Sequence, residues 1–284
     1  MPVPFLTHAR APLTRAIDVL DEYGETRSVS IPAERALTVY VDKRELVTLM
    51  TLGAQPELLV LGWLRNQRLL AAASEVESIT VDWDVDAAAV RTKQGVDRIE
   101  EKTARRVVTT GCGQGSVFGQ VMEAVDAIEL PAATLSQEQL YGLVDVIRRR
   151  DSLYKVAGSV HGCALFRGDE LLFFVEDVGR HNAIDTIAGW MWMQDEAPAG
   201  MSGADKVFYT TGRLTSEMVI KAAQMGVPVV VSRSGITQMG LEVARRLGLC
   251  AIGRATHRRF QCYAGAERLR WQPELAERRP VVAG

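Results

Sequence analysis

Residues 206–232 read KVFYTTGRLTSEMVIKAAQMGVPVVVS. Two short apolar runs in this stretch, Lys206–Thr210 and Pro228–Ser232, predict buried strands. Between them, Ser216–Met225 predicts a helix, and Gly226 follows at the position where a C-cap glycine belongs. The stretch is therefore typical of a β-α-β unit.

The same alternation continues along the chain. Thr237–Leu247 predicts a second helix, with Gly248 as its C-cap glycine, and Leu249–Gly253 predicts a third strand. A β-α-β-α-β run implies parallel strands joined by right-handed crossovers, so the predicted class is α/β. Ligands of open α/β sheets bind outside the carboxyl ends of the strands, and we look for a site there.

The composition is that of an ordinary globular protein. The chain has 284 residues, with 33 Lys+Arg against 35 Asp+Glu, a net charge of −2 and 47% hydrophobic residues. These values exclude a disordered tail, a collagen-like fibre and a strongly basic nucleic-acid coat. The length suits one large or two small domains.

Cysteine usage and hydropathy point to the cytoplasm. Four cysteines (Cys112, Cys163, Cys250 and Cys262) are too few for a disulfide scaffold, and none forms a C-x-x-C zinc pair. The first residues lack the apolar core of a secretory signal, and no stretch approaches the ~20 apolar residues of a membrane span. We therefore expect a soluble cytoplasmic protein with no membrane or nucleic-acid partner.

The first part of the chain is rich in predicted strands. We expect residues 1–28 to be irregular and residues 29–108 to form a small β-rich α+β domain. Its predicted elements are strands at Ala36–Val41, Glu45–Thr51 and Ser78–Val85 and a short helix at Pro56–Trp63 packed on the sheet.

Residues 109–120 form a glycine-rich segment around Cys112. Four glycines fall between Gly111 and Gly119, which predicts a mobile or tightly turned loop. A helix beginning beyond Cys112 would favour its nucleophilic thiolate form. The alternative is a buried small hydrophobic residue, as most free cysteines are, and this is our interpretation of the other three.

The remaining residues, 121–284, are expected to form the larger domain. Ser136 and Gln139 form a capping box that predicts a helix at Gln137–Arg149. A hairpin is predicted from Cys163–Phe166 to Leu171–Val175.

Residues 176–182 should then form a polar loop, with Asn182 capping a helix at Ala183–Trp192.

Each predicted parallel strand ends near an arginine. Arg213 follows the first strand, Arg233 the second, and Arg254–Arg259 the third. A single such arginine is usually a solvated surface residue, but three consecutive strand ends favour an anionic ligand such as a nucleotide or phosphorylated cofactor.

Two histidines, His161 and His181, lie next to predicted elements, where each alone is more often structural than catalytic. The zinc-deaminase pattern needs a glutamate that is absent after His161, so zinc-dependent hydrolysis is not supported.

Several of these segments together resemble one family. The string EDVGRHNA at 176–183, TGR at 211–213 with SEM at 216–218, the Cys112-Gly113 loop and His161 are similar to the formate dehydrogenase accessory sulfurtransferases, the FdhD/NarQ family. The resemblance covers about residues 26–270.

The resemblance implies a function, a fold and partners. Such proteins take persulfide sulfur from a cysteine desulfurase and pass it to the molybdenum bis-guanine-dinucleotide cofactor of formate dehydrogenase. A GDP-like nucleotide can occupy the cofactor site, and no metal site is expected. The implied fold is a cytidine-deaminase-like C-terminal domain with a mixed, mainly parallel sheet, and the implied assembly is a homodimer.

The resemblance also assigns roles to residues. Cys112 corresponds to the persulfide carrier. The residues implied in cofactor binding are Arg254, Ala255, Thr256, His257, Arg258, Arg259, Arg213, Arg180, His181 and His161.

The sequence departs from the family pattern in the loop, where Gly115 replaces the second cysteine. A dithiol relay within the loop is therefore excluded. Thr186 and Arg254 also replace the usual lysine and phenylalanine. Two interpretations stay open: a sulfurtransferase that works with Cys112 alone, and a cofactor carrier or chaperone that has lost sulfur transfer. A zinc deaminase would need zinc at His161 and Cys163.

Overall fold

The structure is a computed structural model that describes residues 4–96, 125–194 and 201–276. These residues form two compact units that interleave along the chain. The first takes its described residues from Met1–Ala124, Asp151–Cys163 and Phe174–Ser202, and the second from Val125–Arg150, Ala164–Phe173 and Gly203–Gly284. The second unit begins at Val125, near the expected boundary at residue 121, but the chain returns to the first unit twice, so residues 121–284 do not form one continuous unit.

The first unit contains a five-stranded sheet in the order β1-β6-β7-β4-β5. Strands β4 and β5 are antiparallel, and the predicted strands and helix of this region are confirmed. The elements of the unit are β1 (Phe5–Leu6), β2 (Thr14–Leu20), β3 (Thr26–Pro32), β4 (Arg35–Val41), β5 (Arg44–Thr51), α1 (Pro56–Asn66), a 3₁₀ turn (Ala73–Glu75), β6 (Val76–Asp82), β7 (Ala87–Thr92), α5 (Leu153–Ala157) and α6 (Arg180–Met193).

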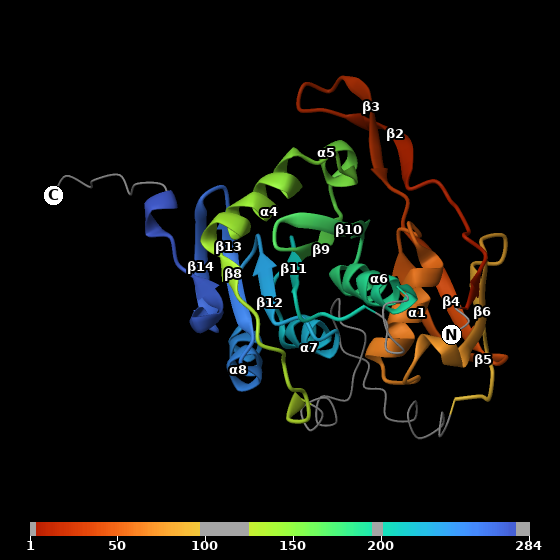
Figure 1. The fold of residues 1–284 in the computed structure, drawn as a ribbon. Coiled ribbons are helices and arrows are strands. Elements are labelled where there is room, and N and C mark those ends of the chain that lie inside the picture. Colours follow the sequence, from red (N-terminus) through yellow and green to blue (C-terminus); the bar gives the residue numbers. More distant parts are fainter. Residues whose placement is uncertain (1–3, 97–124, 195–200, 277–284) are drawn as a thin grey trace. The chain divides into compact units, whose positions relative to one another are not determined.

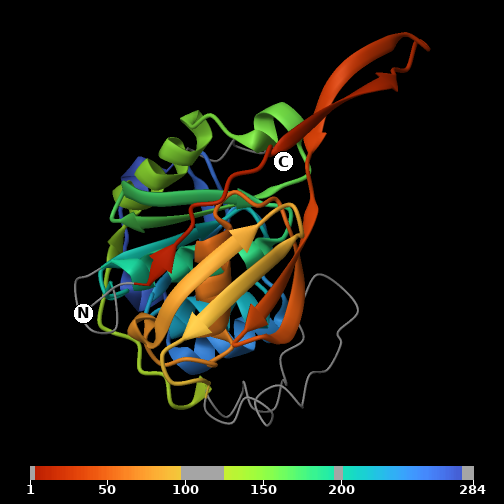
Figure 2. The same cartoon turned by 90° about the vertical axis from the view of Figure 1, so that its right-hand side faces the viewer.

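Residues 1–28 are not irregular, as expected from the sequence, because they include β1, β2 and the start of β3. Figure 2 shows β2 and β3 as a long antiparallel ribbon, paired from Thr14↔Pro32 to Leu20↔Thr26. The carboxylate of Asp21 closes its turn by accepting the N–H groups of Tyr23 and Glu25 at 2.9 and 3.0 Å. No residue of this ribbon is fully buried, and its alternation of apolar and polar residues, as in Ile17-Asp18-Val19, is too short to have signalled a strand.

Helices α1 and α6 touch backbone to backbone. A Cβ atom on Gly62 of α1 would lie 1.7 Å from the carbonyl oxygen of Asp185, and one on Gly189 of α6 would lie 2.0 Å from that of Leu58. The other side of α1 packs on the sheet, as predicted, through a core that includes Trp63.

Arg65 spans the same pair of helices. Its guanidinium donates to the carbonyl of Ala188 at 3.2 Å and lies over the ring of Trp192. Burial lowers the pKa of Arg65 to about 10, because the charged form loses water.

The second unit carries the predicted β-α-β-α-β run. Strands β9 and β10 belong partly to each unit and complete a six-stranded sheet in the order β10-β9-β11-β12-β13-β14. The elements are β8 (Leu135–Ser136), α4 (Gln137–Arg149), β9 (His161–Arg167), β10 (Glu170–Asp177), β11 (Lys206–Thr210), α7 (Ser216–Gln224), β12 (Val229–Ser232), α8 (Gln238–Leu247), β13 (Cys250–Thr256), β14 (Arg259–Ala264), β15 (Leu269–Arg270) and 3₁₀ turns at Ala266–Arg268 and Pro273–Leu275.

Most sequence predictions for this unit are confirmed. Strands β11, β12 and β13 are parallel neighbours, and helices α7 and α8 lie side by side along the sheet (Figure 1). Ser136 and Gln139 form the predicted capping box of α4, and Gly248 ends α8 in the left-handed conformation. The fold is thus a mixed α/β fold with parallel and antiparallel pairing. Within the described residues, no helix is long and apolar enough to cross a membrane.

The helix contact in the first unit gives a stability prediction. Replacing Gly62 by alanine places a methyl group against the backbone of α6, so the two helices must separate. We expect Gly62→Ala to lower the free energy of unfolding by about 3 kcal/mol, measured by urea denaturation.

Gly142→Ala in α4 is the matched control. Its methyl group would meet the exposed side chain of Asp169, with the nearest atom at 2.8 Å, and this side chain can rotate away. Alanine is favoured over glycine in a helix by about 1 kcal/mol, so this variant should be neutral or more stable. Equal losses in both variants would contradict the backbone contact.

Candidate functional site

Six of the ten predicted cofactor-binding residues, those at 254–259, lie on a β-hairpin. The third parallel strand does not end at Gly253, as expected, but continues as β13 to Thr256 and returns as antiparallel β14. The register between β13 and β14 shifts between Gly253 and Thr256, and Arg254 has a left-handed φ of 53°. Irregularities of this kind redirect a side chain, and this one places Arg254 on a pocket wall.

Close packing fixes this irregularity. A Cβ atom on Gly253 would lie 2.7 Å from the ring of Tyr263 and 2.8 Å from the carbonyl oxygen of Ser234, so only glycine fits. The N–H of Arg254 donates to the same Ser234 carbonyl at 2.7 Å. The hairpin is thereby held against the end of the neighbouring parallel strand.

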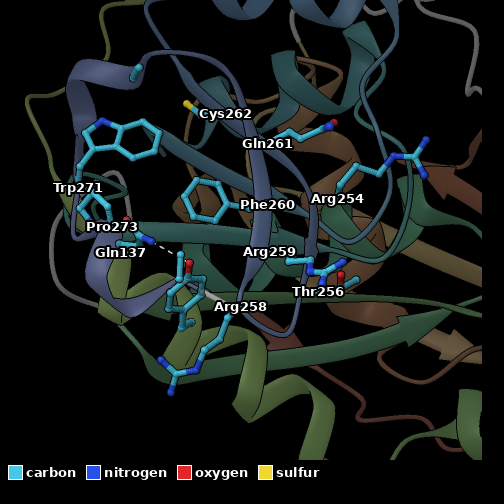
Figure 3. Close-up of a pocket in the computed structure, with 13 residues that line it drawn as sticks. Gln137, Arg254, Thr256, Arg258, Arg259, Phe260, Gln261, Cys262, Trp271 and Pro273 are labelled. Atoms are coloured by element: carbon cyan, nitrogen blue, oxygen red, sulfur yellow. Dashed lines mark hydrogen bonds between the residues drawn. The ribbon is translucent and has the colours of Figure 1, made fainter. Parts of the chain in front are cut away.

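A pocket of about 730 Å³ opens beside this hairpin (Figure 3). It is lined by Gln137, Tyr141, Arg254, Thr256, Arg258, Arg259, Phe260, Gln261, Cys262, Ala266, Trp271, Pro273 and Ala276. Four of the six hairpin residues predicted to bind a cofactor are among them. Of the other two, Ala255 is buried and His257 is exposed in the turn.

Three arginines give the pocket its charge. Among the described residues that line it there are Arg254, Arg258 and Arg259, but no aspartate or glutamate. Arg258 donates to the carbonyl of Leu275 at 3.3 Å, and its guanidinium lies 5.5 Å from the ring centre of Tyr141. Guanidinium groups bind phosphate and carboxylate oxygens in a planar, bidentate geometry, so the wall favours an anionic ligand.

The apolar part of the pocket is an aromatic row formed by Tyr141, Phe260 and Trp271, which was not predicted from the sequence. Tyr141 and Phe260 meet edge to face with ring centres 6.1 Å apart, and Phe260 stacks on Trp271 at 5.9 Å (Figure 3). Trp271 is 52% exposed, which leaves ring surface for a ligand. The available sequence signal was Phe260, which follows the arginines directly.

Hydrogen bonds hold this row in place. The side-chain amide of Gln137 donates to the hydroxyl of Tyr141 at 2.8 Å and accepts from the N–H of Gln272 at 2.9 Å. The N–H of Glu138 donates in turn to the side chain of Gln272 at 3.1 Å. The segment that carries Trp271 is thus tied to the first turn of α4.

Other predicted site residues lie outside the set that lines this pocket. Arg213 is exposed after β11 in the second unit. His161 begins β9, whereas Arg180 and His181 lie in the first turn of α6, and all three belong to the first unit. Arg180 and His181 are buried there.

The expected polar loop at 176–182 is mostly regular structure. Strand β10 runs to Asp177 and α6 begins at Arg180 after the N-cap residue Gly179. Asn182 does not cap the helix, because its amide donates to the carbonyl of Met50 at 2.6 Å and to Asp177 at 2.9 Å. The prediction of a cap was wrong because partners distant in sequence satisfy this side chain.

Asp177 is the centre of that network. Its buried carboxylate accepts the hydroxyl of Thr51 at 2.5 Å and the N–H groups of Leu52 and Gly179 at 3.1 and 3.0 Å, besides the Asn182 amide. Burial raises the pKa of Asp177, and these bonds oppose the shift. The described contacts of this acidic residue are therefore structural.

Glu176 has an equivalent role toward α5. Its two carboxylate oxygens accept the N–H groups of Leu153 and Tyr154 at 2.6 and 3.1 Å, at the start of that helix. The EDVGRHNA string thus holds several elements of the first unit together.

The four cysteines differ in their burial and in whether the structure describes them. Cys112 lies outside the described residues. Cys163 and Cys250 are buried, as predicted, but Cys262 is half-buried and lines the pocket. In the described part of the chain no three His, Cys, Asp or Glu side chains gather as a metal site would require.

Comparison with known proteins decides the family. The sequence profile of the FdhD/NarQ family matches residues 32–270. This chain belongs to the FdhD/NarQ family. Its relatives include the sulfur carrier protein FdhD of Bacillus subtilis, 30% identical over 88% of this chain and 94% of the relative, and that of Bacillus licheniformis, 31% identical over 84% and 89%.

A solved structure has the same fold. A crystal structure named as that of a formate dehydrogenase accessory protein from Desulfotalea psychrophila superposes with a TM-score of 0.71 over 91% of this chain and all of the other. At 24% identity this similarity supports the fold alone. The family resemblance inferred from the sequence is confirmed.

The Asp177 network predicts a loss of stability on mutation. Asp177→Ala would leave four hydrogen-bond donors without their acceptor in a buried site. We expect the free energy of unfolding to fall by about 3 kcal/mol for Asp177→Ala and by about 1 kcal/mol for Thr51→Val, which removes one donor to Asp177 and the acceptor of the Gly53 N–H. Urea denaturation of both variants tests this ranking. An unchanged midpoint for Asp177→Ala would contradict it.

Proposed function

We propose that this protein is a sulfur carrier that accepts persulfide sulfur from a cysteine desulfurase and passes it to a guanine-dinucleotide molybdenum cofactor destined for formate dehydrogenase. Its membership of a family whose relatives are named sulfur carrier proteins supports the carrier role. The pocket, with its arginine wall and its aromatic row, supports the proposed binding of a guanine-dinucleotide cofactor.

The pocket suits a nucleotide as cargo. A purine base stacks on aromatic faces, and the exposed ring of Trp271 offers such a surface. Arg254, Arg258 and Arg259 would bind the pyrophosphate oxygens. A volume of about 730 Å³ lies within the usual range for small-molecule sites and accommodates a GDP-like half of the cofactor.

Cys112 is the proposed persulfide carrier. Its thiolate would attack the outer sulfur of the donor persulfide, so the donor S–S bond breaks, the donor leaves as a thiol and a persulfide forms on Cys112. One attacking thiol suffices for this step, so the replacement of the second loop cysteine by Gly115 does not prevent loading. This chemistry makes the protein a sulfurtransferase.

The proposed location, assembly and fold of the second unit are taken from the family resemblance. We place the protein in the cytoplasm as a homodimer, with a second unit similar to cytidine deaminase. Arg213, Arg180, His181 and His161 are additional candidates for cofactor contacts. The second candidate function is a cofactor carrier without sulfur transfer, which the missing loop cysteine favours.

Nucleotide titration tests the pocket. Loss of one charged hydrogen-bond donor costs about 1.5–3 kcal/mol, so Arg254→Ala and Arg259→Ala should each weaken GDP binding by about tenfold to hundredfold in calorimetry. Trp271→Ala should cost about 1–3 kcal/mol of stacking.

Arg148→Ala is the matched control, since Arg148 is an exposed arginine of α4 that pairs with Asp145 outside the pocket. An equal loss of affinity in this control would show that only overall charge matters.

Persulfide loading separates the two candidate functions. After incubation with a desulfurase and cysteine, mass spectrometry should find one added sulfur atom on Cys112, and Cys112→Ser should abolish both this adduct and support of formate dehydrogenase. A wild-type chain that binds GDP but takes no sulfur on Cys112 would establish the carrier without transfer.

A further inference from the structure

Two cysteines meet beside the pocket. Cys250 on β13 and Cys262 on β14 lie on neighbouring antiparallel strands, where Ile252 pairs with Cys262 after a register shift. Cys250 lies two residues before Ile252, so its side chain shares the face of Cys262 and interacts with it, while the Cys262 thiol also donates to the carbonyl of Ala264 at 3.4 Å. Cys250 is completely buried, whereas Cys262 lines the pocket (Figure 3).

The pKa values of the two thiols are shifted in opposite directions. The hydrogen bond from Cys250 lowers the pKa of Cys262, because it stabilises the thiolate. The same bond, together with burial, raises the pKa of Cys250. A thiol that lines a pocket beside a neighbouring buried thiol is the arrangement of an attacking and a resolving cysteine.

We propose that Cys262 accepts a sulfur atom from a persulfide inside the pocket, and that Cys250 then releases this sulfur as sulfide by forming a Cys250–Cys262 disulfide. The inference rests on the proposed function, since a sulfur carrier brings persulfides to this pocket. It supplies the reductive step for which the loop, with Gly115 in place of a cysteine, has no second thiol.

The chemistry balances in two steps. The Cys262 thiolate attacks the outer sulfur of R–S–SH, the donor S–S bond breaks, and R–S⁻ leaves and takes up a proton. The Cys250 thiol then attacks Sγ of Cys262 and its proton passes to the departing outer sulfur, which leaves with the bonding electrons as H₂S and ionises to HS⁻. Two thiols are thus oxidised to a disulfide while one sulfane sulfur is reduced to sulfide.

The product fits the site in which it forms. The HS⁻ ion would form in the pocket whose arginine wall favours anions. An external dithiol reductant restores the two thiols for the next cycle.

The test uses full-length protein with Cys112→Ser, so that the loop cysteine does not contribute. Sodium disulfide serves as an inorganic persulfide donor, and intact-mass and peptide mass spectrometry provide the readout. We expect the Cys112→Ser chain to lose two hydrogen atoms, to yield a peptide pair joined through Cys250 and Cys262, and to release sulfide.

Further substitutions in the Cys112→Ser chain separate the two roles. With Cys250→Ser, the chain should retain one extra sulfur atom on Cys262 and form no disulfide, and Cys250→Ala replaces this variant if it folds poorly. With Cys262→Ser, neither product should appear. Cys163→Ser is the matched control, a buried cysteine of the same sheet, and should behave like the Cys112→Ser parent.

Two outcomes would overturn the inference: no added sulfur on Cys262 in the Cys250→Ser chain, or a disulfide that forms equally well without Cys262. Desulfurase loading of Cys112, measured in a Cys250→Ser, Cys262→Ser double variant, reports on the proposed function separately. If Cys112 loads and Cys262 does not, the carrier function stands and the thiol-pair step fails. If Cys262 loads and Cys112 does not, the thiol-pair step stands and the proposed carrier residue is wrong.

Discussion

The buried carboxylate of Asp177 is the constraint on which the first unit depends. A carboxylate removed from water must be surrounded by donors, and here the donors come from the end of β5 and from the first turn of α6. Satisfying it fixes where β10 ends and where α6 begins. With its start fixed, α6 lies against α1 closely enough that Gly62 and Gly189 are required at the crossing.

The sequence predicted the parallel part of the fold because every signal there is local. Apolar strands alternate with helices, and residues such as Thr237 and Gly248 mark helix ends. Its failures have non-local causes. The ribbon β2–β3 has no fully buried face, so its apolar alternation is short. Asn182 donates to the distant Met50 and Asp177, and the irregularity at Arg254 depends on how Tyr263 packs over Gly253.

The candidate site shows the same division between local and distant information. Its arginines are clustered in the sequence and were identified there, whereas its aromatic row draws Tyr141, Phe260 and Trp271 from three separate segments. The contact between Cys250 and Cys262 depends on strand pairing, so no local feature distinguished Cys262 from the cysteines that were expected to be buried. The positive charge of the pocket was thus predictable from the sequence, while its aromatic wall and the Cys250–Cys262 contact were not.

The interleaving of the two units determines how the chain must be made. The ribosome finishes the sheet of the first unit and α1 long before it reaches α6, which supplies the helical partner of α1. Until then the face of α1 that will contact α6, which includes Leu58 and Gly62, stays uncovered. Neither unit can be excised as a continuous gene fragment, and an early stop codon would remove part of both.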